Sequence, residues 1–535
     1  MILITPGTNL CRESLSTTRA LVMTLCLLLF PMILHARPGS SAPDDLRAKM
    51  SPLLLREVTL LRDNPQYDYP MPVIIQVNRD DFPGGAPGQP ERALGLIRGY
   101  TARLTSREIS QMAESDEIAY VTIDPIIRAS GAGLDPVDRR RSAPGESLGE
   151  LSRRPRNPFL GAIGVDQAQV KGRDGSGVTV ALFDSGLGRH PDIDSSRIKA
   201  AVDFTSGTAR MVERNSDEYG HGTHVAGIIG GSGLSSGGFY RGVAPAVDFV
   251  DLKVTGEDGS GLTSNVIRAI QWVIENKKVY GIQVANFSVS HPPIESYRDS
   301  PLSQAVEKLV AAGVVAVASA GNLGRTQRYA KVFGAIGSPG YSPAVITVYP
   351  VNTRGTARHA DDIATTYGSR GPTYLDRLFK PDIAAPGNKI PSLLAAGSVL
   401  SRARPQLVVN GRYFVMSGAS MATPFVTGTV AMMLQTNPDL TTSLVKAALL
   451  VTAVKLAQPH LLEQGNGLLN ARLAVELASN VDVDNRTLRH PLSPTWLLDG
   501  ELVWASGGHG MLSQHLATLG RLWDDQVLWD DQVLW

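Results

Sequence analysis

Runs of uninterrupted apolar residues, separated by helical stretches, constrain the fold of this chain more than any other feature. Segments 178–183 and 314–318 are apolar throughout, as in strands that are buried on both faces of a parallel sheet. Three more segments have the same character: 249–254, 284–289 and 344–348. Helical patterns over 265–275 and 302–312 lie between them. This alternation predicts an α/β fold with a doubly wound, mostly parallel sheet, whose site lies beyond the carboxyl ends of the strands.

An acid, an imidazole and a hydroxyl stand beside glycines at three points far apart in the chain. They are Asp184 in Phe-Asp-Ser-Gly, His221 in Gly-His-Gly-Thr-His, and Ser420 in Gly-Ala-Ser-Met-Ala-Thr-Pro. A serine hydroxyl is a poor nucleophile at neutral pH and needs a base, which a carboxylate in turn orients. The run 421–435 predicts a helix with Pro424 in its first turn, where the missing N–H of proline costs nothing.

Together with their flanks, these segments resemble the motifs of the subtilisin-like serine peptidases (subtilases), and the resemblance covers about 157–480. It implies that Ser420 is the nucleophile, that His221 is the base, and that Asp184 orients His221 and stabilises its cation. Ala419 stands where threonine is usual in the family, and alanine removes a hydroxyl without adding bulk. The implied activity is hydrolysis of peptide bonds through an acyl-enzyme.

The resemblance also implies how the oxyanion and the substrate are held. Asn322, in the segment Ala-Gly-Asn, matches the family's oxyanion asparagine, and the backbone N–H of Ser420 is the second donor. Two further segments resemble the edges between which subtilases bind a peptide as an added strand. Their residues are Gly259, Ser260 and Gly261 in the first segment, and Ser288, Val289 and Ser290 in the second.

The second edge segment departs from the family pattern in a way that bears on specificity. Val-Ser at 289–290 stands where Leu-Gly is common, so Ser290 is expected to narrow the pocket for the residue before the scissile bond. Leu323, directly after the oxyanion asparagine, adds apolar surface there. No acidic residue matches a pocket for paired basic residues, so furin-like specificity is not expected.

No cofactor is required for this chemistry, and no metal site is assigned. His221 and His224 have the spacing His-x-x-His, but no further ligand follows on the helix, and His224 is expected to pack or hydrogen-bond within the helix. Asp192 matches one ligand of a common calcium site of the family. The loop 231–242 that normally supplies the others has no carboxylate or amide side chain, whereas calcium takes about six to eight oxygen ligands. Structural calcium is therefore left open but is not supported.

Residues 1–36 have the layout of a secretory signal. Arg12 and Arg19 precede the uncharged, mostly apolar segment 20–34, and the small residue Ala36 precedes the expected cut. The apolar segment is shorter than the roughly 20 residues that span a bilayer. An uncleaved anchor is the alternative, because Leu34 is unfavourable two places before the cut. We expect a secreted protein, extracellular, periplasmic or on the cell surface, whose mature chain lacks both cysteines and so cannot form disulfides.

Residues 37–156 predict a small α+β unit at about 72–124 and a basic linker. The strand candidates are 73–77, 97–104 and 118–123, and Thr105 to Glu108 form a capping box that opens a helix. The unit resembles the pro-segment that acts in subtilases as folding chaperone and then as inhibitor; an ordinary accessory domain is the alternative. The linker carries Arg clusters at 139–141 and 153–156, and its composition predicts an exposed segment where maturation would occur, by this enzyme or by another protease.

The remaining features narrow the function. The net charge of +1 argues against nucleic-acid binding. No regular pattern is found in the tail 481–535, and its two WDDQVL copies are too few for a repeat fold; a loosely docked tail and a sorting or binding tag are the alternatives. The sequence predicts a secreted serine endopeptidase, made as a self-inhibited precursor, that binds protein or peptide substrates and its own pro-segment, with no stable membrane span. A processing protease with one target is the alternative, and a silent binding module is disfavoured because none of the three groups is missing.

Overall fold

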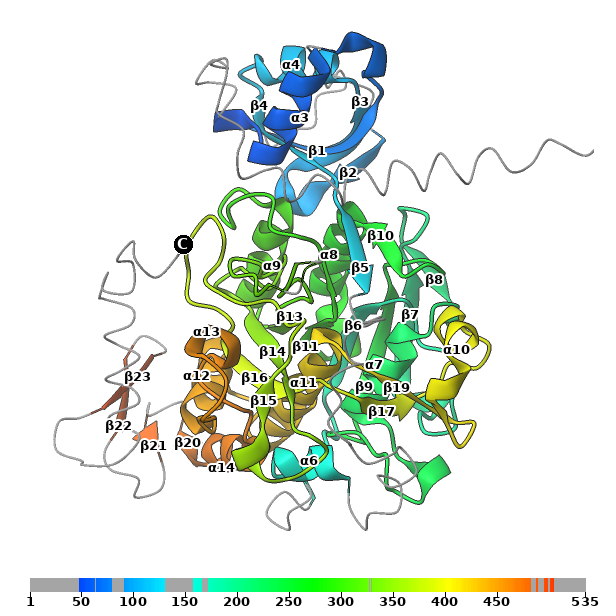
Figure 1. The fold of residues 1–535 in the computed structure, drawn as a ribbon, viewed down its shortest axis with the longest axis vertical. Coiled ribbons are helices and arrows are strands. Elements are labelled where there is room, and N and C mark those ends of the chain that lie inside the picture. Colours follow the sequence, from blue (N-terminus) through cyan, green and yellow to red (C-terminus); the bar gives the residue numbers. More distant parts are fainter. Residues whose placement is uncertain are drawn as a thin grey trace, which may run out of the picture. The chain divides into compact units, whose positions relative to one another are not determined.

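The structure is a computed structural model of the 535-residue chain. It describes residues 48–62, 64–78, 91–129, 157–165, 172–326, 328 and 330–482, and the strand segments 487–488, 495–498 and 501–504 (Figure 1). Two compact units are distinguished, Met1–Ala48 and Lys49–Trp535, and every element described below belongs to the second. The expected signal segment, the basic clusters of the linker and the C-terminal repeat lie outside the described residues.

A central sheet of nine strands organises the described part of the chain. Its strands are β6 (Thr179–Asp184), β7 (Ile198–Asp203), β8 (Arg210–Val212), β9 (Asp248–Lys253), β11 (Ile282–Phe287), β13 (Val315–Ser319), β14 (Ile346–Asn352), β15 (Ile363–Ala364) and β16 (Ile383–Pro386). Their order is β15-β14-β13-β11-β6-β9-β7-β8, with β16 paired to β14. The pairs β14–β15 and β7–β8 are antiparallel and the others are parallel. The predicted fold class is confirmed, and each of the five predicted strands overlaps a strand of this sheet.

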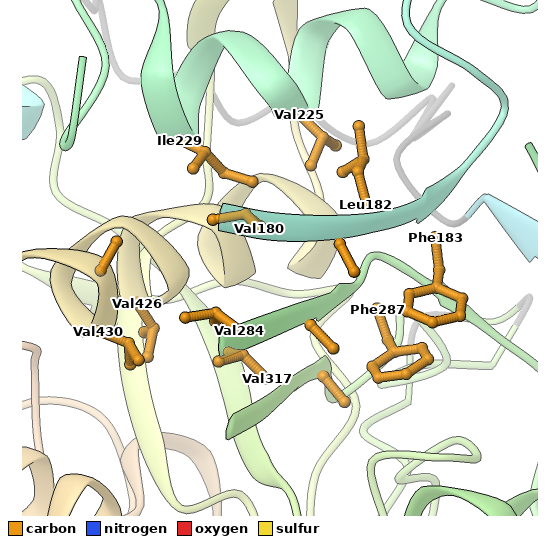
Figure 2. Packing of buried hydrophobic residues seen from close by; sticks show 14 of the residues in the cluster. Val180, Leu182, Phe183, Val225, Ile229, Val284, Phe287, Val317, Val426 and Val430 are labelled. Atoms are coloured by element: carbon orange, nitrogen blue, oxygen red, sulfur yellow. The ribbon is translucent and has the colours of Figure 1, made fainter. Parts of the chain in front are cut away.

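Helices flank the sheet and bury its apolar strands. The main ones are α7 (His221–Gly230), α8 (Thr263–Tyr280), α9 (Pro301–Ala311), α11 (Ala419–Thr436), α12 (Thr442–Thr452) and α14 (Ala471–Asn480). Figure 2 shows Val225 and Ile229 of α7 over Val180 of β6, and Val426 of α11 near the strands. The fully buried Phe183 and Phe287 stack with ring centroids 4.3 Å apart. This aromatic pair lies at the carboxyl ends of β6 and β11 and supports the backbone just before Asp184.

The N-terminal part of this unit is a separate antiparallel sheet with two helices. It contains α3 (Pro52–Arg62), β1 (Met71–Val77), β2 (Arg92–Leu94), β3 (Gly99–Leu104), α4 (Ser106–Ala113) and β4 (Ile118–Ile123), with strand order β2-β3-β1-β4. Thr105 and Glu108 form the predicted capping box at the start of α4. Helix α3 precedes the range 72–124 and was not expected, although its buried Leu54 and Val58 have helical spacing.

The sequence shows no regular pattern after residue 480, but the structure places short strands between residues 481 and 504. Four short strands form an antiparallel sheet there: β20 (Val481–Asp482), β21 (Thr487–Leu488), β22 (Thr495–Leu498) and β23 (Glu501–Trp504). Segments of two to four residues are too short to give a periodic signal. None of the helices in the described ranges combines the length and the hydrophobicity that crossing a membrane requires.

Candidate active site

Asp184 and His221 come together at the carboxyl edge of the central sheet. Asp184 is the last residue of β6 and His221 the first residue of α7, and both side chains are fully buried. Nδ1 of His221 lies 2.7 Å from Oδ1 of Asp184, which also accepts the backbone N–H of Ser185 at 2.8 Å. A carboxylate on Nδ1 selects the tautomer in which Nδ1 carries the proton and Nε2 is a base. Nε2 of His221 is buried, and no residue of the described ranges hydrogen-bonds to it.

Ser420 lies in the first turn of α11 and exchanges hydrogen bonds with Ser288. Its hydroxyl donates to the Ser288 carbonyl at 2.9 Å, and the Ser288 hydroxyl donates to the Ser420 carbonyl at 3.1 Å. The hydrogen bond from Ser420 to Nε2 of His221 is not formed in this state. Hydrogen bonds between catalytic groups are often loose without substrate, so this arrangement is compatible with a nucleophile and its base.

The position of Pro424 differs from the expectation and explains part of this geometry. Helix α11 begins at Ala419, so Pro424 lies in the second turn and not in the first. A proline has no N–H to donate to the carbonyl four residues earlier, which here is that of Ser420. The Ser288 hydroxyl donates to that carbonyl instead.

Asn322 is anchored to the start of the same helix. It follows β13 by three residues, and its side-chain Oδ1 accepts the backbone N–H of Ala419 at 2.9 Å. Because Oδ1 is held by this N–H, the amide group is fixed with respect to Ser420, the next residue along the helix.

The two predicted edge segments lie on either side of a strand of the same chain. This strand, β5 (Ile126–Ala129), pairs antiparallel with β10 (Ser260–Leu262) and with β12 (Val289–Ser290). The backbone N–H of Ala129 donates to the Gly259 carbonyl at 2.9 Å. Ile127 and Ala129 are buried, whereas Ile126 and Arg128 are exposed. Figure 1 shows β5 beside β10. Sequence reasoning missed β5, because four residues gain strand geometry only from partners more than 100 positions away.

His224 and Asp192 are both held by protein groups. Nε2 of His224 lies 3.1 Å from the Ile390 carbonyl and 2.9 Å from that of Phe414. These carbonyls belong to β17 (Ile390–Leu393) and β19 (Tyr413–Met416), so the expected bonding within the helix is wrong. Burial lowers the pKa of His224 to about 3, so its imidazole is neutral.

The donors around Asp192 do not fit a calcium ion. Its Oδ1 accepts the backbone N–H of Ser235 at 2.8 Å, and its Oδ2 accepts the Tyr413 hydroxyl at 2.7 Å. A calcium ligand would direct these oxygens at the cation. Within the described ranges, no group of three or more His, Cys, Asp or Glu side chains is arranged to hold a metal ion.

Comparison with known proteins identifies the class of this protein. The model of the subtilase family matches residues 175–467, and the chain belongs to that family. The class that this fold and family define is that of the serine-type endopeptidases with the subtilisin fold.

Three relatives show the range of similarity. Serine protease AprX of Bacillus subtilis (strain 168) is 38% identical over 283 residues, which are 51% of this chain and 61% of AprX, less than two thirds of its length. Alkaline elastase YaB of Bacillus sp. (strain YaB) is 31% identical over 376 residues, 68% of this chain and 84% of that protein. Subtilisin Savinase of Lederbergia lenta is 31% identical over 310 residues, 57% of this chain and 94% of that protein.

Proposed function

We propose that this chain is a secreted serine endopeptidase made as a self-inhibited precursor, with Asp184, His221 and Ser420 as its catalytic residues. The observation that carries the proposal is the buried 2.7 Å contact between Asp184 and His221, together with the pairing of strand β5 between the edge strands β10 and β12. No metal or cofactor is required by this set of groups.

The reaction follows from the roles that these groups can take. The Ser420 hydroxyl turns from Ser288 to Nε2 of His221, gives up its proton there and attacks the peptide carbonyl carbon. Asp184 stabilises the resulting imidazolium, and the Asn322 amide and the Ser420 backbone N–H stabilise the oxyanion. Collapse of the tetrahedral intermediate breaks the C–N bond, and His221 gives its proton to the leaving amine. Water then releases the acyl group by the same steps.

The substrate is proposed to bind as β5 does, as a strand between β10 and β12. Main-chain pairing reads no sequence, so side chains must supply selectivity. In β5 the two inward side chains, Ile127 and Ala129, are apolar and buried, and the two outward ones are exposed. We therefore expect preferred substrates to carry an apolar side chain where Ile127 lies and a small one where Ala129 lies, with Ser290 limiting the pocket that follows.

Self-inhibition is supported by the contacts that seat the N-terminal sheet on the α8 and α9 helices. Oδ1 of Asp124 accepts the backbone N–H of Ser264 at 2.9 Å, and the Pro125 carbonyl accepts that of Thr263 at 3.0 Å. These two N–H groups start α8, whose own N-cap, Leu262, has no side-chain acceptor. The Gln76 amide donates to Gln304 of α9 at 2.7 Å. These contacts hold the N-terminal sheet against α8 and α9, and they therefore support the position of β5 between β10 and β12.

Structural calcium is proposed to be absent at Asp192. Secretion is the first proposal to be tested, and it rests on the N-terminal sequence pattern. Mass spectrometry of the protein in the growth medium tests the first proposal, because a mature chain must begin after residue 36. A chain that keeps residues 1–36 in the membrane fraction would contradict it.

Two measurements test the proposed function. Wild type should react with a fluorophosphonate probe and Ser420→Ala should not, since only an activated serine reacts. Ser420→Ala should also accumulate as a soluble, inactive precursor with the linker after β5 uncut. Trimming of the variant at the same bond as wild type, with no active copy present, would show that another protease matures this chain.

A further inference from the structure

We propose that Asp217 is a positioning residue for the reaction, holding the loop of Asp184 and the helix of His221 as one hydrogen-bonded unit. The inference rests on the proposed roles of Asp184 and His221. Asp217 itself does not touch the reacting atoms, and it was not singled out by the sequence analysis.

The Asp217 carboxylate receives hydrogen bonds from both parts of the site. Its Oδ1 accepts the Gly220 backbone N–H at 2.7 Å and the Ser185 hydroxyl at 2.8 Å. Its Oδ2 accepts the Thr223 backbone N–H at 2.8 Å. The residue is only 7% exposed, so each of these bonds is made away from bulk water.

Ser185 connects this carboxylate to Asp184 and His221. The Ser185 hydroxyl accepts the Gly222 backbone N–H at 2.9 Å, directly after His221, while it donates to Asp217. The Ser185 backbone N–H donates to Oδ1 of Asp184, the same oxygen that meets Nδ1 of His221. Asp217 and Ser185 therefore fix both partners of the 2.7 Å contact.

The side chains of Ser185 and Asp217 also cap the N-terminus of helix α7. The N-cap of α7 is Gly220, which has φ 102° and no side chain to accept an N–H. The first N–H groups of a helix need acceptors from outside it. Ser185, in the loop after β6, accepts from Gly222, and Asp217, in the segment that leads into α7, accepts from Thr223, so these two side chains together cap the helix that begins at His221.

The backbones of helix α7 and of the loop after Asp184 are packed so closely that they have little space to shift relative to each other. A Cβ on Gly222 would lie 2.2 Å from the Gly186 carbonyl oxygen, so α7 and the Asp184 loop are in direct contact. Catalysis is sensitive to displacements of about 1 Å in such a site. Loss of the hydrogen bonds that hold the two backbones together should therefore lower the rate of the chemical step more than substrate binding.

Asp217 accepts hydrogen bonds from three donors, as an ionised carboxylate does, and in that form it also contributes its charge. The positive end of the α7 dipole disfavours a cation at His221, and a carboxylate at the same end offsets this effect. Burial raises the pKa of Asp217, while hydrogen bonds from Thr223, Gly220 and Ser185 lower it. Among the described residues, the ionisable groups near His221 and Asp217 include Asp184, Tyr219, His224, Asp251 and Lys253, whose ammonium donates to the Ser216 carbonyl.

The test is steady-state kinetics of Asp217→Asn, Ser185→Ala and Asp194→Asn, with the active fraction counted by the fluorophosphonate probe. Asp217→Asn should lower kcat per active site about tenfold to a hundredfold, with KM within about twofold. It should also move the acid limb of the kcat/KM profile to lower pH, because a negative charge near the imidazolium is lost. Ser185→Ala should lower kcat without shifting the acid limb of the kcat/KM profile. Asp194 is an exposed capping aspartate, and its variant should match wild type.

Each outcome decides between the alternatives. Unchanged kcat per active site and an unchanged pH profile in Asp217→Asn would overturn the inference, even if less protein folds. If Asp217→Asn does not fold, Ser185→Ala provides the test. A kcat equal to that of wild type in Ser185→Ala then overturns the inference. A wild-type chain that neither reacts with the probe nor cleaves peptides overturns the proposed function as well, whereas failure of the variants alone leaves it intact.

Discussion

Individual hydrogen bonds around Ser420 determine which atoms are positioned for the proposed hydrolysis reaction. Pro424 leaves the Ser420 carbonyl without a helical donor, and the hydroxyl of Ser288 occupies that place. Asn322 is held through Oδ1, which accepts the Ala419 N–H, and the proposed mechanism uses its Nδ2 as the oxyanion donor.

Asn322→Ala tests the oxyanion role. We expect kcat to fall by roughly 10²–10³ with little change in KM, a magnitude known from a subtilisin. Steady-state kinetics on a peptide substrate measures both constants. A large rise in KM at unchanged kcat would instead make Asn322 a substrate-binding residue.

Tyr413→Phe tests the account of Asp192. The variant leaves a buried carboxylate oxygen without its donor, so we expect the free energy of unfolding to fall by about 1.5–3 kcal/mol. Exposed Tyr374→Phe is the control and should be neutral. Treatment of wild type with a chelator should leave the unfolding midpoint where it is, and a drop on chelation would contradict the proposed absence of calcium at Asp192. Denaturant unfolding in a Ser420→Ala background avoids self-digestion.

At the level of elements, strand β9 carries a buried acid. Asp251 is fully buried, and its Oδ2 accepts the Leu187 N–H at 3.0 Å, while its Oδ1 has no hydrogen-bond partner among the described residues. Burial raises the pKa of Asp251 to about 7. A raised pKa means that the contribution of this group to stability is complete below its unfolded pKa of ~3.9 and is lost as pH rises through about 7.

Asp251→Asn should therefore stabilise the protein in alkali. Asparagine keeps an acceptor for Leu187 and carries no charge, so we expect a gain on the order of a few kcal/mol at pH 8 and little difference near pH 4. Unfolding curves at both pH values, again with Ser420→Ala, provide the measurement. Equal effects at the two pH values would rule out ionisation as the cause.

The elements that could be predicted from the sequence are those whose signal is local. Strand β6 is apolar on both faces and α4 has its capping box, so short windows were enough. Strand β5 and the role of Asp217 depend on partners far along the chain, and a lone sequence carries no trace of such pairings. Asp184, His221, Ser420 and Asn322 could be assigned only because their flanks match a family, since spacing alone does not bring four distant segments together.

At the scale of the whole molecule, two buried acids lie where the N-terminal sheet meets the catalytic part. Glu295 is 3% exposed and accepts the Tyr120 hydroxyl at 3.3 Å, and burial raises its pKa to about 7, with Asp299 acting in the same direction. Burial likewise raises the pKa of Asp124 to about 6, despite the hydrogen bond from Ser264. Both carboxyls would regain ordinary pKa values in water, so docking takes up protons. Docking is then strongest below about pH 4 and weakens as pH rises through 6 to 7.

We expect this linkage to appear in hydrogen exchange of full-length Ser420→Ala. Protection of the β4 amides, corrected for intrinsic rates, should fall between pH 5.5 and pH 8. Glu295→Gln should flatten that dependence, because the amide mimics the protonated acid, whereas Glu476→Gln on α14, 57% exposed, should not. The same fall in the Glu295→Gln chain would assign the dependence to other groups.

The seating of β5 has a kinetic consequence for an enzyme of this kind. In the proposed self-inhibited precursor, β5 would compete with substrate as a tethered ligand while the chain is unbroken, at an effective concentration of roughly millimolar however dilute the protein is. Once the linker is cut, the same strand becomes an ordinary competitor whose occupancy depends on total concentration. A single hydrolysed bond thus changes inhibition from concentration-independent to concentration-dependent, and simple dilution away from the site of synthesis would complete activation.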